Sequence, residues 1–268
     1  MNNKKFIYLF ITIYLLTMYL IPADKWQKVD KGLDWNIFNI KHNMETFKFY
    51  VLRINPKLYS LHLLSAKEKS HTPLSLKQWS KKYNLIAGIN ASMYLPDKLK
   101  STGYMKNFNF FNNKRINKRF SSFIAFNPKN KHSKPAIIIE KNSINWKVKL
   151  NRYNTVIQNY RIIDAKQKIR WGKKNMSAIA TFGIDNSGNV LFIFSSQKIA
   201  TYDFAKIILN LPLRVYNLSY LEGGYEASLY INHNNFQFNL NGNLFNSARI
   251  NKIFINPPLP NIIGIRKK

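Results

Sequence analysis

The chain has 268 residues, of which 46% are hydrophobic, enough for one sizeable core or at most two small ones. Its formal net charge of +30 suggests an anionic neighbour. The absence of cysteine excludes disulfides, thiolate nucleophiles and zinc–thiolate sites, and no two histidines have a metal-ligand spacing.

The 42 basic residues are dispersed along the chain rather than gathered into one run. Compositional drift therefore competes with a charged partner as the explanation of the net charge. No zinc-finger spacing, arginine-rich arm or aromatic RNA-binding motif accompanies the lysines. We expect no specific nucleic acid partner, and we expect a phosphate-bearing glycan, with an anionic membrane surface as a further candidate.

The N-terminus has the pattern of a targeting segment. Lys4 and Lys5 precede an uncharged run over residues 6–21, which is short for a membrane span but suits a signal peptide. Because Ile21 is not small, cleavage is poorly specified, and an uncleaved signal anchor is the alternative. The pattern predicts a signal peptide or anchor over 1–23, a linker over 24–34, and an exported domain over 35–268, periplasmic or at the cell surface.

Short apolar runs separated by Asn and Gly turns predict an α+β fold: one mixed domain with an antiparallel-rich sheet and two principal helices. Helical spacing predicts the helices over 73–83 and 201–211. A loop or flap is expected over 95–120, and residues 141–155 show no clear pattern. The expected strands are 35–40, 47–54, 58–64, 85–89, 122–126, 136–139, 178–184, 190–194, 214–220, 228–231, 236–240, 253–255 and 262–265.

The most informative segment is 221–229, where Glu222 precedes the pair Gly223-Gly224 and Glu226 follows it. Paired glycines allow positive φ and close approach of the backbone to another group. A carboxylate at a strand end beside such a turn is well placed to face a ligand. The alternative is a tight turn with two solvated acids, and this segment alone leaves both interpretations open.

Two other polar residues sit at the ends of expected strands. Asn90 follows a buried strand, where its amide is placed to hold a sugar hydroxyl or a metal, or to close an Asx-turn. Asp185 begins the segment 185–189, which has the composition of a hairpin turn, so we interpret Asp185 as a turn residue rather than a catalyst.

Four segments in this order resemble the phosphodiester glycosidase family, which includes the domain that uncovers mannose 6-phosphate by removing a covering N-acetylglucosamine. The similarity spans about 45–265. The matching segments are the strand and turn AGINASMY at 87–94, the loop STGY at 101–104, the hairpin at 178–194 and the turn LEGGYEAS at 221–228.

The resemblance implies a hydrolase that cleaves the bond between a sugar and a phosphodiester in an envelope or extracellular glycan. Such chemistry generally uses two carboxylates. The resemblance assigns these roles to Glu222 and Glu226, and it makes Arg161 a candidate phosphate clamp. The implied substrate-binding residues are Asn90, Thr102, Gly103, Gln158, Arg161, Gly223 and Gly224. The cofactor stays open, with a divalent cation as one candidate.

The chain departs from the family pattern in ways typical of a divergent bacterial branch. Glu222 stands where many members have Asp, Met176-Ser177 where many have Arg, and Tyr225-Glu226 where many have Gly-Ser. These departures permit an alternative, a catalytically inactive glycan-binding module of the same fold. A basic protein that binds nucleic acid or a membrane surface is the third hypothesis, which predicts a steep loss of binding with salt.

Overall fold

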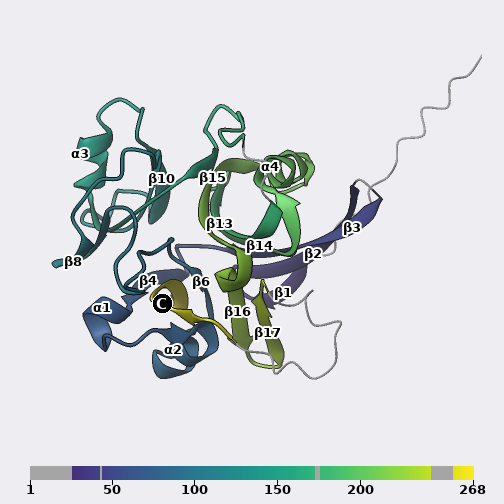
Figure 1. Ribbon diagram of the computed structural model, residues 1–268, viewed down its shortest axis with the longest axis horizontal. Helices are drawn as coiled ribbons and strands as arrows, with labels where there is room; N and C mark the ends of the chain where they lie inside the picture. Colours follow the sequence, from purple (N-terminus) through teal and green to yellow (C-terminus); the bar gives the residue numbers. More distant parts are fainter. Residues whose placement is uncertain (1–25, 43, 173–175, 243–255) are drawn as a thin grey trace, which may run out of the picture.

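The computed structural model describes residues 26–42, 44–172, 176–242 and 256–268 (Figure 1). These residues form antiparallel sheets with few helices, which confirms the predicted α+β fold. The expected signal segment 1–23 and the expected strand 253–255 lie outside the described residues.

The largest sheet carries the segment with the paired glycines. Its seven strands are, in spatial order, β1 (Gln27–Asp30), β2 (Leu33–His42), β3 (Glu45–Ile54), β14 (Val190–Ala200), β13 (Met176–Asp185), β15 (Val215–Gly223) and β12 (Arg161–Ile163). Most of these strands were predicted in place, because their apolar residues recur with strand periodicity. The polar segment 24–34, interpreted as a linker, instead contains β1 and the start of β2.

Two five-stranded sheets complete the framework. One has the order β10 (Ala136–Glu140), β9 (Ser122–Pro128), β11 (Tyr153–Asn159), β7 (Met105–Asn107) and β8 (Phe110–Asn113). The other has the order β17 (Phe236–Asn241), β16 (Ser228–His233), β6 (Ala87–Asn90), β19 (Asn261–Lys267) and β4 (Tyr59–Ser65). A short ladder joins β18 (Pro258–Leu259) to β5 (Leu74–Ser75).

The two predicted principal helices are confirmed as α2 (Leu76–Lys82) and α4 (Thr201–Asn210). Helix α2 begins later than expected because Ser75 and Gln78 form a capping box, while Leu74–Ser75 forms β5. The segment 141–155 contains α3 (Trp146–Leu150) and the start of β11, and α1 (Ala66–Lys69) was not anticipated. Among the described helices, none has the length and apolarity needed to cross a bilayer.

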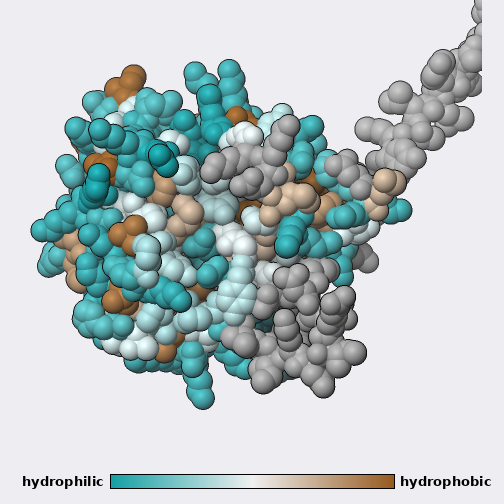
Figure 2. Space-filling view, in the orientation of Figure 1, coloured by the Kyte–Doolittle hydropathy of each residue, from teal (hydrophilic) through white to brown (hydrophobic). Residues whose placement is uncertain are grey.

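One apolar core joins the three large sheets. Its largest cluster of buried side chains includes Phe192 of β14, Ile89 of β6 and Ile124 of β9. A second cluster packs α4 against the other face of the seven-stranded sheet, through residues such as Phe204 and Phe49. Figure 2 shows mainly hydrophilic residues on the viewed face, with hydrophobic ones as separate spots. The sheets therefore form a fixed frame from which the connecting turns project.

Candidate functional site

The paired glycines lie where the chain passes from one sheet to another. Strand β15 ends at Gly223, the short 3₁₀ turn η1 (Gly224–Glu226) follows, and β16 then begins in a different sheet. Gly224 has φ +71°, a conformation that favours glycine, and a Cβ on Gly223 would run into the Tyr220 hydroxyl oxygen. Both glycines are therefore required by the geometry of this connection.

Asn90, at the end of β6, holds this turn in place through two hydrogen bonds. Its Nδ2 donates to the Glu226 carbonyl oxygen at 2.9 Å, and its Oδ1 accepts from the Ser228 backbone N–H at 2.7 Å. The structure thus brings Asn90 to the turn that carries Glu222 and Glu226. The Asn90 side chain is buried, and the two bonds engage both ends of its amide with the protein backbone.

The two acids of the turn have different surroundings. Burial raises the pKa of Glu222 to about 8, the nearby negative charge of Glu226 adds to the rise, and a hydrogen bond from the Gly223 N–H opposes it. The Gly223 N–H lies 3.1 Å from Glu222 Oε1. Tyr94 donates its hydroxyl to Glu226 Oε1 at 3.4 Å. Glu222 is therefore suited to carry a proton near neutral pH.

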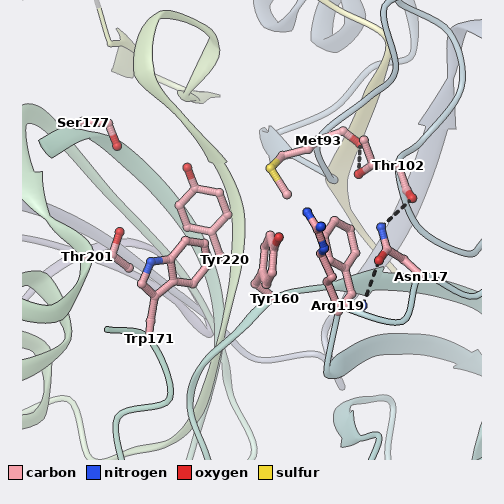
Figure 3. Close-up of a pocket in the computed structure, with 10 residues that line it drawn as sticks. Met93, Thr102, Asn117, Arg119, Tyr160, Trp171, Ser177, Thr201 and Tyr220 are labelled. Carbon is pink, nitrogen blue, oxygen red and sulfur yellow. Dashed lines mark hydrogen bonds between the residues drawn. The ribbon is translucent and has the colours of Figure 1, made fainter. Parts of the chain in front are cut away.

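A pocket of about 400 Å³ adjoins the turn (Figure 3). Its lining residues are Met93, Thr102, Asn117, Arg119, Phe120, Tyr160, Trp171, Ser177, Thr201 and Tyr220. Ser177 and Tyr220 link it to the turn, because both side chains lie directly against Gly223. The Trp171 ring lies 4.7 Å from both the Tyr160 and Tyr220 rings, measured between centroids. An aromatic wall of this kind suits the apolar face of a sugar ring.

Of the other predicted substrate-binding residues, Thr102 lines the pocket, whereas Gln158 supports it from beneath. Gln158 is fully buried, and its Nε2 donates to the carbonyl oxygens of Asn117 and Phe120. Its Oε1 accepts from the backbone N–H groups of Tyr104 and Asn117. The Gln158 amide is therefore occupied by the loop that carries the pocket wall, and its role is structural.

Gly103 is also structural, which gives a testable prediction. A Cβ at this position would lie 2.8 Å from the Phe120 ring and 2.9 Å from the Gln158 carbonyl oxygen. We expect Gly103→Ala to lower the free energy of unfolding by about 1–3 kcal/mol, as for other overpacked sites. Gly172→Ala is the matched control, because its added Cβ would meet nothing within 4 Å. Equal melting temperatures for the two variants would contradict this packing argument.

Arg161 does not reach the pocket, which corrects its interpretation as a phosphate clamp. Its Nη1 lies 2.8 Å from Glu140 Oε2 and 2.7 Å from Asn142 Oδ1. Arg161 is not among the residues that line the pocket, although its neighbour Tyr160 is. The guanidinium is held in a largely buried ion pair instead.

Asp185 has the turn role expected from the sequence. Its Oδ1 accepts the N–H groups of Ser187 and Asn189 at 2.9 and 2.8 Å, which closes the hairpin between β13 and β14. Sequence reasoning missed Arg119, Tyr94 and the aromatic wall. Tyr160 lies between β11 and β12, outside any strand, so no strand periodicity marks it as a pocket residue.

A metal was one candidate cofactor. Within the described ranges, no group of three or more His, Asp or Glu side chains is arranged to hold a metal ion. The divalent cation therefore stays a prediction that binding or activity measurements must test.

Comparison with known proteins assigns the chain to a family. The chain resembles a solved hypothetical protein from Synechocystis, with a TM-score of 0.65 and 13% identity over 92% of this chain. It spans only 64% of that protein's length. It also resembles the catalytic domain of zebrafish N-acetylglucosamine-1-phosphodiester alpha-N-acetylglucosaminidase, with a TM-score of 0.64 and 10% identity, covering 90% of this chain and 86% of the other. At such identities the likeness shows the fold alone.

No curated protein matches the sequence. The sequence pattern of the phosphodiester glycosidases matches residues 83–266, which is more than half of the chain. This match covers the Asn90 strand end, the pocket loop and the turn with Glu222 and Glu226. The chain belongs to the phosphodiester glycosidase family.

Proposed function

We propose that the protein is an exported hydrolase that cleaves the bond between a sugar and a phosphodiester in a phosphate-bearing glycan. The observation that carries the proposal is the pair of acids on either side of Gly223-Gly224, one of them with a pKa of about 8. Neither acid lines the aromatic pocket itself, but the lining residues Ser177 and Tyr220 lie against Gly223, between the two acids. Family membership supports the reaction class.

The two acids suit different parts of the reaction. Glu222, protonated near neutral pH, serves as the general acid that donates a proton to the departing phosphate oxygen. Glu226 then serves as the second carboxylate, either as the base that activates water or as the nucleophile at the anomeric carbon. The hydrogen bond from Tyr94 orients the Glu226 carboxylate.

A panel of sugar-1-phosphodiesters, offered to the purified domain with and without divalent cations, tests the proposal. Turnover that is lost in Glu222→Gln supports it. Binding of these compounds without turnover would instead favour the inactive glycan-binding module. If the protein neither binds nor cleaves any compound of the panel, both interpretations of the pocket are wrong.

Arg119 supplies the cation that the phosphate group needs. It lines the pocket, where Figure 3 shows its guanidinium beside Tyr160, and it takes part in no salt bridge with any described acid. Charge-assisted hydrogen bonds are worth about 1.5–3 kcal/mol each. We therefore expect Arg119→Gln to raise KM for a sugar-1-phosphodiester about 10- to 100-fold, measured by steady-state kinetics.

The control for this prediction is Arg152→Gln, which removes the same charge from an exposed turn outside the pocket. Its KM is expected to stay within twofold of the unaltered protein. Equal KM values for Arg119→Gln and Arg152→Gln would remove Arg119 from the phosphate site.

Export is part of the proposal because Lys4, Lys5 and the uncharged run 6–21 have the pattern of a signal peptide or anchor. A reporter enzyme that is active only outside the cytoplasm should therefore show activity when it is joined to the C-terminus. A reporter active only in the cytoplasm would contradict export and leave the enzymatic proposal standing.

A further inference from the structure

Four cations lie within six residues of the loop that supplies Arg119 to the pocket. We call Lys114, Arg115, Lys118 and Arg119 the basic rim; all four side chains are exposed. Within the described part of the chain, none of them forms a salt bridge with a carboxylate. Like charges so close together repel one another, and this repulsion is relieved when an external anion binds.

The basic rim is a fixed structure rather than a loose flap. Asn117, at the centre of the rim, donates from its Nδ2 to the Thr102 carbonyl oxygen at 3.1 Å. The Gln158 side chain accepts from the Asn117 backbone N–H and donates to the Asn117 carbonyl oxygen. Lys141 Nζ reaches the carbonyl oxygens of Asn117 and Lys118 at 3.3 and 3.0 Å. The backbone that carries the four cations is therefore held in place before any ligand arrives, which reduces the entropic cost of binding.

One member of the basic rim lines the pocket, and the other three lie on the same loop. Arg119 belongs to both, and its neighbours Asn117 and Phe120 also line the pocket. One phosphodiester in the pocket needs only Arg119. Lys114, Arg115 and Lys118 lie along the same segment but outside the pocket lining, so they remain available for further anionic groups of the same ligand.

We propose that the basic rim is a subsite for additional phosphate groups, so that the substrate is an anionic polymer of repeated sugar-phosphodiester units. This inference rests on the proposed function and adds the substrate class. A flexible polymer can pass from the pocket onto the rim, whereas a flat bilayer cannot enter the pocket. The bond cleaved and the roles of Glu222 and Glu226 are the same as for a single unit.

The test compares one sugar-1-phosphodiester capped by a methyl group with a synthetic chain of four such units. The rim variant carries Lys114→Gln, Arg115→Gln and Lys118→Gln, and retains Arg119. The control variant carries Lys129→Gln, Lys131→Gln and Lys134→Gln, which removes the same charge from exposed residues. These three lysines lie beyond the far end of β9, about 20 Å from its start near the rim.

The rim variant is expected to lose about tenfold in kcat/KM for the four-unit chain, since each exposed ion pair contributes a factor of roughly two to five. Its kcat/KM for the single unit should change less than twofold. The control variant should lose little with either substrate. An equal loss on both substrates by the rim variant, or no loss on the chain, would overturn the proposal.

Binding separates this proposal from the proposed function. Fluorescence anisotropy with a labelled four-unit chain should show weaker and less salt-dependent binding by the rim variant. If the unaltered protein cleaves neither substrate but shows this difference, the subsite stands and the hydrolase proposal fails. If the rim variant loses binding only to vesicles of anionic lipid and not to the chain, the rim is a membrane contact and the polymer subsite is wrong.

Discussion

Replacement of Glu222 by glutamine is expected to lower kcat/KM for a sugar-1-phosphodiester about 10²- to 10⁴-fold, the usual contribution of a general acid or base. Glutamine matches the size of the side chain and retains an oxygen that can accept the Gly223 N–H, now bonded at 3.1 Å. It cannot donate the proton that a carboxyl group with a pKa of about 8 carries near neutral pH. The fold should therefore survive while the reaction slows.

The same variant should be more stable than the unaltered protein near neutral pH. The pKa of Glu222 is about 8 in the folded protein and near 4.5 when unfolded, so between these values the folded state binds more protons. Stability then falls as pH rises from about 4.5 to 8, and Glu222→Gln removes this loss. We expect a gain of roughly 1–3 kcal/mol at pH 7, measured by urea unfolding, and no gain at pH 4.

Glu45→Gln is the matched control, because Glu45 is an exposed acid at the start of β3. Its activity and its stability profile should both follow those of the unaltered protein. Unchanged phosphodiester cleavage by Glu222→Gln would remove Glu222 from the reaction. In that case Glu226 would be the remaining candidate carboxylate, and Glu226→Gln would test it. If Glu222 is the general acid and Glu226 mainly orients the turn, Glu226→Gln should slow the reaction less than Glu222→Gln does.

Much of the fold could be predicted because strand periodicity is a local property of the sequence. The β13–β14 hairpin followed from apolar runs on either side of the turn that begins at Asp185. The wrong predictions concern segments whose secondary structure depends on contacts with residues distant in the sequence. The polar segment 27–30 forms a strand because it pairs with β2, although its own residues show little burial. Helix α3 is one short helical turn whose Trp146 stacks on Phe123, a contact that its own sequence does not encode.

The site was predictable in part for the same reason. The paired glycines and the polar residue at the end of β6 are local signals, and the structure brings them together. Arg119 could not be found in this way, because the loop that carries it is positioned by Gln158, about 40 residues later in the chain. Arg161 was wrongly preferred because its charge was considered without its partner Glu140, which lies 21 residues earlier in the chain and forms an ion pair with it.

Replacement of Asn90 by alanine is expected to have the second large effect, and on stability as well as activity. It leaves the Glu226 carbonyl oxygen and the buried Ser228 N–H without their present partner. Each such group costs about 1–3 kcal/mol, so we expect a loss of roughly 2–4 kcal/mol in the free energy of unfolding. Catalysis should also fall, because the turn that carries both acids loses its attachment to β6.

This prediction distinguishes two roles of Asn90, holding the turn in place through hydrogen bonds and binding the sugar directly. If Asn90 held a sugar hydroxyl, Asn90→Ala would raise KM at an unchanged melting temperature. If it holds the turn, urea unfolding without substrate will already show the loss. Asn90→Asp retains the acceptor for the Ser228 N–H but sets a buried carboxylate oxygen against the Glu226 carbonyl oxygen, so it should be no more stable than Asn90→Ala at neutral pH. The exposed Asn151→Ala is the matched control. Activity measured well below the melting temperature of Asn90→Ala then shows whether the loosened turn itself, and not global unfolding, slows the reaction.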